Sequence, residues 1–326
     1  MTQLMARVSG VGSYLPERIV TNDELARTVD TSDAWIRERT GIKRRHIAAD
    51  GETTVDMGEM AARRALDNAG LDASEIDLII VATTTPDLVF PSCATMIQGR
   101  LGITQGAAFD VQAVCSGFIY ALSIADGLIL TGQHRNVLVI GAETMSRIID
   151  WTDRATCVLF GDGAGAFVLQ AGESQRGKPF GRGLIGAYMR ADGSFLDLLR
   201  TTGGVSSSQS SGLLTMQGNA VYRHAVTKIC EAMTTLMERH GVTSADIDWF
   251  VPHQANQRIL EGVAKRLGIA PDKVISTVAD QGNTSAASVP LAFDQAVRDG
   301  RIQRGDLCLL EALGGGFTWG SALIRF

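Results

Sequence analysis

The sequence AGLDASEIDLIIV at residues 69–81 recurs as HGVTSADIDWFV at residues 240–251, with Ile76 aligned to Ile247. The flanking matches keep the same order: VGSY at 11–14 parallels IGAY at 185–188, and RLGI at 100–103 returns at 266–269. A chain that repeats itself once in this way is expected to fold as two halves that share one topology.

Each half alternates short apolar runs with longer helical patterns, as in residues 57–69 followed by 78–82. This alternation is typical of largely parallel strands covered by helices, which predicts the α/β class. The predicted halves are residues 1–172 and 173–326, and the polar stretch 172–178 marks the seam between them. Active sites in such folds favour the crevice outside the strand ends, here where the halves meet.

The composition excludes several classes of protein. With 326 residues, 45% of them hydrophobic and 20% charged, the chain is long enough to bury a large core. A formal net charge of −5 argues against a nucleic-acid-binding protein, which is expected to be basic. Neither a signal-peptide pattern nor an apolar run of about 18 residues is present, so we expect a cytoplasmic protein that does not enter a membrane.

The five cysteines are an odd number without any C-x-x-C spacing, which favours reduced thiols over disulfides or a zinc site. The five histidines show no paired spacing on one helix face, which disfavours a metal hydrolase. Cys157 and Cys308 lie inside apolar runs, where they are expected to fill the core. Cys115 differs, because its stretch FDVQAVCSG at 109–117 is a predicted strand-to-helix junction.

A thiol in the first turn of a helix lies near unsatisfied N–H groups, which favour the thiolate and predict a lowered pKa for Cys115. The alternative is a buried packing cysteine. Two polar residues of the second half are candidates to meet the thiol. His253 follows the apolar run 247–251, and Asn283 follows the second copy of RLGI at nearly the same spacing as Cys115 follows the first. Each is open to a purely structural reading, a satisfied histidine or a turn asparagine.

With these motifs, the chain resembles the β-ketoacyl-acyl carrier protein synthase III family, the initiating condensing enzymes of type II fatty-acid synthesis. The resemblance covers essentially the whole chain and rests on four motifs: AVCSGF at 113–118, PHQAN at 252–256, GNTSAASVP at 282–290 and GGGFTWG at 314–320. It implies a thiolase-like fold, two halves related by a pseudo-twofold axis in five layers, αβαβα. The Cys-His-Asn set separates this group from elongating condensing enzymes, which use a second histidine where Asn283 stands.

The resemblance also implies a ping-pong mechanism without a cofactor or metal. Cys115 is expected to take a short acyl group, in the simplest case acetyl, from acyl-CoA, with the backbone N–H groups of Cys115 and Gly315 as the oxyanion hole. His253 and Asn283 are then expected to stabilise the enolate that forms when malonyl-acyl carrier protein loses CO₂. The products are 3-ketoacyl-carrier protein, CoA and CO₂.

Further residues carry roles over from the family by position. Trp35, Arg39 and Arg154 match the residues that stack on the CoA adenine, and Gly218 and Asn256 match residues that bind the pantetheine arm. Arg258, Lys265 and Arg266, on a predicted helix after His253, are candidates to dock the acidic carrier protein; the other reading is ordinary surface charge.

Tyr222, Leu313 and Phe90 are assigned to the acyl pocket. Tyr222 and Leu313 stand where well-known members carry Phe, which leaves the length of the primer open. Phe90 matches a residue that crosses a homodimer interface to line the partner's pocket, so the resemblance predicts a homodimer. The alternatives are a related condensing enzyme with a longer or branched primer in polyketide, quinolone or ketone synthesis, a degradative thiolase, and a carrier-protein-binding module without catalysis.

Overall fold

Two twisted sheets form the frame of the molecule. The computed structural model describes residues 4–173 and 183–326, so most of the predicted seam lies outside the described residues. The first sheet has the order β1-β7-β6-β4-β5, with β4 parallel to β5 and β6 and with β7 antiparallel to β1 and β6. Its strands are β1 (Leu4–Tyr14), β4 (Leu78–Ala82), β5 (Ala107–Val111), β6 (Asn136–Thr144) and β7 (Asp162–Glu173).

The second sheet repeats this order with one strand fewer, β8-β13-β12-β11. Its strands are β8 (Gly183–Ala191), β11 (Trp249–Pro252), β12 (Leu307–Gly314) and β13 (Thr318–Arg325). Strand β11 pairs in parallel with β12, as β4 does with β6. Where β5 lies in the first sheet, the second has an isolated parallel bridge between Phe250 and Val274. The duplication predicted from the sequence is therefore confirmed in the connectivity of the strands.

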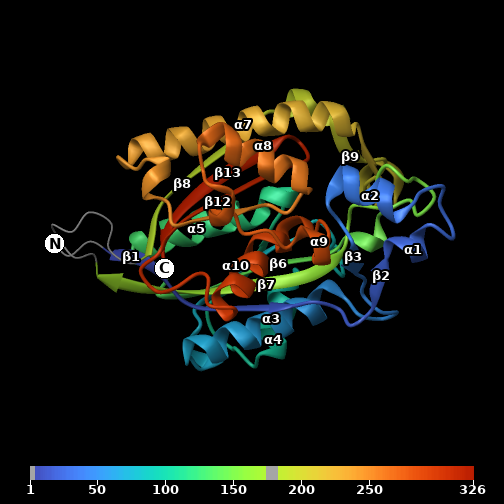
Figure 1. Ribbon diagram of the computed structural model, residues 1–326. Helices are drawn as coiled ribbons and strands as arrows, with labels where there is room; N and C mark the ends of the chain where they lie inside the picture. Colours follow the sequence, from blue (N-terminus) through green and yellow to red (C-terminus); the bar gives the residue numbers. More distant parts are fainter. Residues whose placement is uncertain (1–3, 174–182) are drawn as a thin grey trace.

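The helices complete five layers, which Figure 1 shows from bottom to top. Helices α3 and α4 cover the outer face of the first sheet, α5 and α10 lie between the sheets, and α7 and α8 cover the second sheet. Their bounds are α3 (Thr54–Ala69), α4 (Cys93–Arg100), α5 (Gly117–Leu130), α7 (Gly218–Arg239), α8 (Gln257–Leu267) and α10 (Ser288–Arg298). Strand β4 is buried along its whole length because helices cover both faces of its sheet.

The two copies of the repeated stretch, which begin at residues 69 and 240, form the same local structure. Gly70 and Gly241 both adopt the left-handed conformation that ends a helix, with φ of 63° and 64°. Each is followed by a short 3₁₀ turn closed by a capping box, at residues 72–75 and 243–246. The two turns then lead into β4 and β11. The sequence repeats here because the chain turns in the same way.

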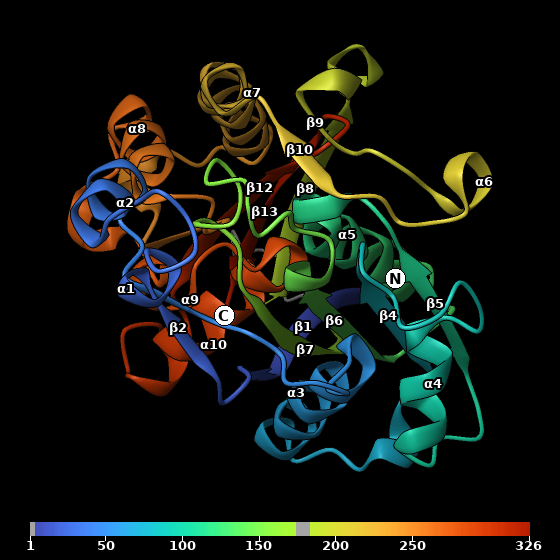
Figure 2. The same ribbon diagram turned by 90° about the vertical axis from the view of Figure 1, so that its right-hand side faces the viewer.

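Shorter elements gather at the end of the molecule that faces the viewer in Figure 2. The antiparallel pairs β2–β3 and β9–β10 lie there with α1 and α2. These elements are β2 (Ile19–Thr21), α1 (Asn22–Leu25), α2 (Asp33–Thr40), β3 (Arg44–His46), β9 (Leu199–Thr201), α6 (Val205–Ser208), β10 (Leu214–Met216) and α9 (Val278–Gln281). None of the helices within 4–173 and 183–326 combines the length and apolarity needed to cross a membrane.

Candidate active site

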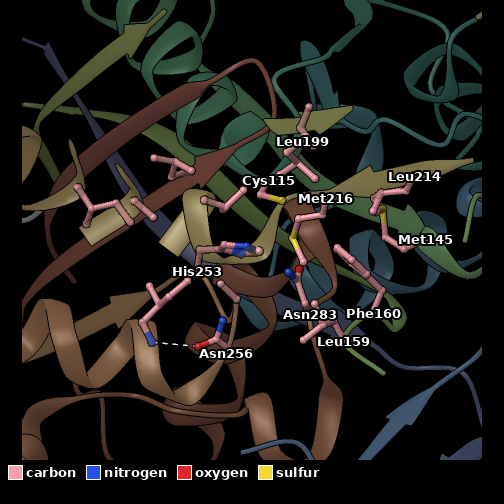
Figure 3. Close-up of a pocket in the computed structure, with 18 of the residues that line it drawn as sticks. Cys115, Met145, Leu159, Phe160, Leu199, Leu214, Met216, His253, Asn256 and Asn283 are labelled. Carbon is pink, nitrogen blue, oxygen red and sulfur yellow. Dashed lines mark hydrogen bonds between the residues drawn. The ribbon is translucent and has the colours of Figure 1, made fainter. Parts of the chain in front are cut away.

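A cavity of about 90 Å³ contains the three residues that the sequence singles out, Cys115, His253 and Asn283. Figure 3 shows their side chains around one space, with Met216 and Phe160 beside them. The other lining residues are mostly apolar and come from both halves of the chain: Val114, Met145, Leu159, Leu199, Leu214, Gly218, Val221, Ala225, Ile229, Ala255, Asn256, Ile259, Glu311 and Leu313. The structure thus brings the predicted trio together.

Cys115 lies in a tight turn at the entrance to α5. Val114 has φ of 49°, a left-handed conformation that non-glycine residues rarely adopt, and a short 3₁₀ turn at 114–116 then leads into the helix. The second half has the same turn before α10, where Ser285 has φ of 51°. The residue after this strained position is Cys115 in the first half and Ala286 in the second, so the two correspond. Asn283 precedes Ser285, so it is a neighbour of the position equivalent to Cys115 rather than that position itself.

The thiol of Cys115 is buried, with 4% of the residue exposed. Loss of hydration raises its pKa to about 12; the nearby Glu143 carboxylate adds to the rise, while a hydrogen bond with Ser285 opposes it. This direction is opposite to the one predicted from the helix N-terminus. That prediction was wrong because burial penalises the thiolate more strongly than the turn stabilises it.

His253 presents a neutral imidazole to the cavity. Burial lowers the pKa of its ring to about 3. Its backbone N–H donates to Glu311 O at 2.9 Å, and its Nδ1 lies 2.6 Å from Ser288 Oγ. The next residue, Gln254, is fully buried and fixes the loop: its amide donates to Pro252 O and Ile275 O, and its Oε1 accepts the backbone N–H groups of residues 277 and 278.

Asn283 is held by both halves of the chain. Its backbone N–H donates to Leu159 O at 2.8 Å, and its backbone carbonyl accepts from Gly161 N at 3.0 Å. Its side-chain Oδ1 accepts the Ser285 N–H at 2.9 Å, which identifies that atom as the oxygen of the amide. The other end of the amide, Nδ2, has no partner among the described residues. Asn283 therefore offers N–H donors to the cavity.

A buried carboxylate supports the turn that carries Ser285. Ser285 Oγ donates to Glu143 Oε1 at 2.9 Å, while the Thr85 hydroxyl and the Thr84 backbone N–H donate to Glu143 Oε2 at 2.6 and 3.0 Å. Desolvation raises the pKa of Glu143, and these donors oppose the rise. They satisfy the carboxyl group without a cation, and they anchor a strained turn beside Asn283.

Bare glycine backbone lies against Cys115 from the other half. A Cβ atom at Gly314 would lie 2.6 Å from Cys115 N, so only glycine allows β12 to approach this closely. Thr318 Oγ1 then joins the segments, 2.9 Å from Ala113 O and 2.8 Å from Ser116 Oγ. The backbone of residues 314–316 is thereby held beside the thiol.

Comparison with known proteins agrees with this geometry. A family profile described as 3-oxoacyl-(acyl-carrier-protein) synthase III matches residues 109–193, and its C-terminal counterpart matches residues 237–326. A β-ketoacyl-(acyl-carrier-protein) synthase III of Rhodospirillum rubrum is 61% identical over 319 residues, which is 98% of each chain. The chain belongs to the 3-oxoacyl-(acyl-carrier-protein) synthase III family.

Two solved structures extend the comparison. The synthase III of Aquifex aeolicus aligns with a TM-score of 0.92 and 44% identity over 98% of this chain and 100% of its own. The priming β-ketosynthase of the R1128 polyketide pathway aligns with a TM-score of 0.93 and 38% identity over 99% of this chain and 96% of its own. The thiolase-like fold predicted from the family's motifs is thus confirmed.

The residues that the family resemblance assigns to coenzyme A lie together on the surface. The guanidinium groups of Arg39 and Arg154 lie 4.6 and 5.3 Å from the centre of a Trp35 ring. Trp35 also packs on the apolar cluster that includes Leu214 of the cavity wall, and Met216 of that wall packs on the same cluster.

At the other side of the cavity, Gly218 begins α7 and Asn256 caps α8. Asn256 Oδ1 accepts the Ile259 N–H at 3.0 Å, the dashed line in Figure 3, which leaves the Asn256 amide N–H groups for a ligand. In the described chain, no cluster of three or more His, Cys, Asp or Glu side chains is arranged to hold a metal ion.

The structure departs from the sequence-based assignment of the acyl pocket at Tyr222. Leu313 lines the cavity, but Tyr222 does not: its neighbour Val221 does, because successive residues of a helix point about 100° apart. Tyr222 instead lies under the guanidinium of Arg258, 5.6 Å from its ring centre. Phe90 is 83% exposed and lies outside this chain's cavity.

Arg258, Lys265 and Arg266 all lie on α8, and none of them is buried. Arg258 and Lys265 are two helical turns apart and share a face of the helix, whereas Arg266 points toward α7 and donates to Thr227 Oγ1 at 3.2 Å.

Four buried polar residues of the site were assigned no role from the sequence: Gln254, Ser288, Glu143 and Glu311. Gln254 and Ser288 lie inside quoted motifs, which was the available signal. Their contacts join segments far apart in the chain, so the sequence pattern alone could not assign their partners.

Proposed function

We propose that this protein catalyses the decarboxylative Claisen condensation of a short acyl-CoA, most simply acetyl-CoA, with malonyl-acyl carrier protein. The products would be 3-ketoacyl-carrier protein, CoA and CO₂, the first condensation of fatty-acid synthesis. One observation carries the proposal: a cysteine thiol and two neutral N–H donors, from His253 and Asn283, line one apolar cavity.

In the first half-reaction, the sulfur of Cys115 attacks the thioester carbonyl and CoA leaves. The developing oxyanion needs donors that are fixed in advance, and the backbone N–H groups of Cys115 and Gly315 fill this role in the proposal. The close approach of Gly314 to Cys115 N supports it, because it holds both N–H groups near the sulfur.

In the second half-reaction, the malonyl thioester loses CO₂ and leaves an enolate, whose oxygen accepts hydrogen bonds from His253 and Asn283. The enolate carbon then attacks the acyl-cysteine, and the thiol is regenerated. Neutral donors suit this step, since a charged imidazolium would be costly to bury before any negative charge develops.

The cavity favours a short primer. Its volume of about 90 Å³ is smaller than the roughly 150 Å³ apolar cavity that holds benzene in another protein. Leu313, Leu159 and Phe160 close its walls. We propose an acyl group of about two to four carbons on this basis.

Coenzyme A would bind with its adenine at the surface of Trp35, Arg39 and Arg154 and with its pantetheine arm past Gly218 and Asn256. CoA thioester is a substrate here, and the reaction transfers no electrons, so the proposal includes no cofactor. The five cysteines are free thiols, which fits the reducing cytoplasm as the compartment of the reaction.

The proposal includes a homodimer of chains that each fold as halves 1–172 and 173–326. Leu88, Val89 and Phe90 form a run of exposed apolar side chains, which a second copy would cover. A light-scattering mass of one chain at micromolar concentration would contradict the dimer.

A panel of acyl-CoA primers with malonyl-carrier protein tests the reaction. We expect acetyl-CoA or propionyl-CoA to give the highest kcat/KM, with values falling for chains above about four carbons. A preference for long or branched primers would place the protein with condensing enzymes of polyketide, quinolone or ketone synthesis. No 3-ketoacyl product from any primer would contradict the proposal and favour a carrier-protein-binding module.

Carrier-protein docking on α8 has a separate test. Arg258→Glu and Lys265→Glu should raise the KM for malonyl-carrier protein at least about tenfold at low salt and leave acylation by acyl-CoA unchanged. Arg63→Glu on α3, an exposed arginine on the opposite side of the layers, is the control. An equal effect of all three substitutions would remove α8 as the docking face.

A further inference from the structure

Ser288 is a buried serine behind the imidazole of His253. It is the first residue of α10 and has no exposed surface. Its Oγ lies 2.6 Å from His253 Nδ1, a short distance for a neutral hydrogen bond, and it accepts the backbone N–H of Gln254 at 3.3 Å. Among the described residues, these are the two hydrogen bonds that this oxygen makes.

These two contacts leave one arrangement of protons that satisfies the hydroxyl. A serine hydroxyl has one proton to donate and two lone pairs. The Gln254 N–H occupies one lone pair. If His253 Nδ1 carried a proton, it would occupy the other, and the buried serine O–H would have no acceptor. If Nδ1 is bare, the serine O–H donates to it, and every group has a partner. A buried donor without an acceptor costs about 1–3 kcal/mol, which decides between the two.

We propose that Ser288 is a positioning residue that donates its hydroxyl proton to His253 Nδ1 and thereby fixes the imidazole as the Nε2–H tautomer. The Nε2–H group then faces the cavity as a permanent hydrogen-bond donor. This inference deepens the proposed function, because it explains why His253 acts as a donor to the enolate oxygen rather than as an acceptor. Burial of the ring, which keeps it neutral, is consistent with this assignment.

The surroundings of His253 give the imidazole no reason to ionise. Its backbone N–H is bonded to the main-chain oxygen of Glu311, and burial alone, without a charged neighbour, shifts the pKa of its ring. A carboxylate partner would favour imidazolium, whereas a hydroxyl donor favours the neutral ring with a bare Nδ1. The serine thus sets the tautomer without setting a charge.

Nuclear magnetic resonance of protein labelled with ¹⁵N at histidine tests the tautomer directly, without substrate. Two-bond proton–nitrogen correlations separate the protonated ring nitrogen from the bare one, and the His253 signals are identified by their loss in His253→Gln. We expect a protonated Nε2 and a bare Nδ1 between pH 6 and 8. A protonated Nδ1 in the wild-type protein would overturn the proposal whatever the enzyme does.

Substitutions add a kinetic readout. Ser288→Ala should shift His253 toward a mixture of tautomers and lower malonyl decarboxylation at least about tenfold, since a wrong histidine tautomer is costly in other enzymes. Acyl transfer from acyl-CoA to Cys115 should fall less than about threefold. Ser288→Thr, which keeps the hydroxyl, should restore both the tautomer and most of the decarboxylation.

Ser13→Ala is the matched control, because Ser13 is also buried and also donates to α10, at Asp294. It should destabilise the fold by a similar amount without changing the His253 signals. If Ser288→Ala leaves the tautomer unchanged, the positioning role is refuted. If the tautomer is as expected but the wild-type protein does not decarboxylate malonyl-carrier protein, the proposed function fails and the tautomer assignment stands.

Discussion

At the scale of single residues, burial keeps the groups of the site uncharged. The thiol of Cys115 and the ring of His253 both lie in apolar surroundings, and their pKa values move in the directions that favour the neutral forms, up for the thiol and down for the imidazole. Because burial lowers the pKa of the ring to about 3, His253 is a weak base for the thiol proton. Its position beside the amide N–H groups of Asn283 supports the role in decarboxylation that we propose for it.

His253→Ala and Asn283→Ala should separate the two half-reactions. Each removes one donor to the enolate oxygen, so we expect malonyl decarboxylation to fall about 10²–10³-fold in either variant. Acyl transfer to Cys115 should remain, because the oxyanion donors of that step come from the backbone. Release of labelled CO₂ and formation of acyl-enzyme measure the two steps. Decarboxylation retained in both variants would refute the assigned roles.

Glu311 gives a prediction on stability. Its side chain lines the cavity, its Oε2 has no partner, and burial raises its pKa to about 8. The unfolded chain loses this proton near pH 4.3, whereas the folded chain keeps it to about pH 8. Between these values the folded state binds more protons, so this contribution to stability is present at low pH and is lost as the pH rises.

Glu311→Gln stays neutral at every pH and should remove that loss. The free energy of unfolding in urea, measured from pH 5 to 8, should fall more steeply in the wild-type protein than in the variant, by at most about 1.4 kcal/mol per pH unit. Burial also raises the pKa values of Glu143 and Asp162. Both residues are present in the two proteins, so their contributions cancel when the unfolding free energies are subtracted. Parallel curves would show that Glu311 is ionised in the fold.

At the scale of elements, the site depends on turns and strands that cross closely. Strand β12 carries Gly314 where it passes Cys115 N, and β6 carries Gly141 where it passes Ala286 O. A Cβ atom at Gly314 would lie 2.6 Å from Cys115 N, and one at Gly141 would clash with Ala286 O. In each half, therefore, one strand has a glycine at the position where the turn of the other half packs on it. The turns hold left-handed Val114 and Ser285 in matching places.

Gly314→Ala should damage the site through this contact. The added methyl group meets backbone rather than a mobile side chain, so we expect a loss of about 1–3 kcal/mol in stability and acylation of Cys115 reduced at least about tenfold. Gly127→Ala on α5 is the control, because its Cβ would meet nothing within 4 Å and alanine favours the helix by about 0.5–1 kcal/mol. Thermal unfolding and the rate of acylation are the measurements. Normal acylation by Gly314→Ala would mean that β12 does not position Cys115.

The same elements show what the sequence could predict. Cys115 and His253 were identifiable because each follows an apolar run. Asn283 was identifiable because it follows the second copy of RLGI at nearly the spacing of Cys115 from the first, and all three lie in the motifs that carry the family resemblance. The raised pKa of the thiol and the orientation of Tyr222 were not predictable. Both depend on how deeply α5 is covered and how α7 is rotated, and these follow from packing between distant segments.

At the scale of the whole molecule, duplication explains why the residues of the candidate site are divided between the two halves. The strand order, the capped turns and the matching strained turns make Cys115 and Ala286 equivalent positions, so one half has a thiol where the other has a methyl group. The second half contributes His253 and Asn283 from loops near that position. The repeat could be found from the sequence because its glycines and capping residues are required by the turn geometry in both copies.

The most direct measurement of the central claim is the intact mass of the protein after incubation with acetyl-CoA, followed by peptide mapping. We expect one acetyl group per chain, located on Cys115, lost on addition of malonyl-carrier protein and absent in Cys115→Ala. Acetyl groups on another residue, or no adduct with any short acyl-CoA, would contradict the assignment of Cys115 as the residue that carries the acyl group.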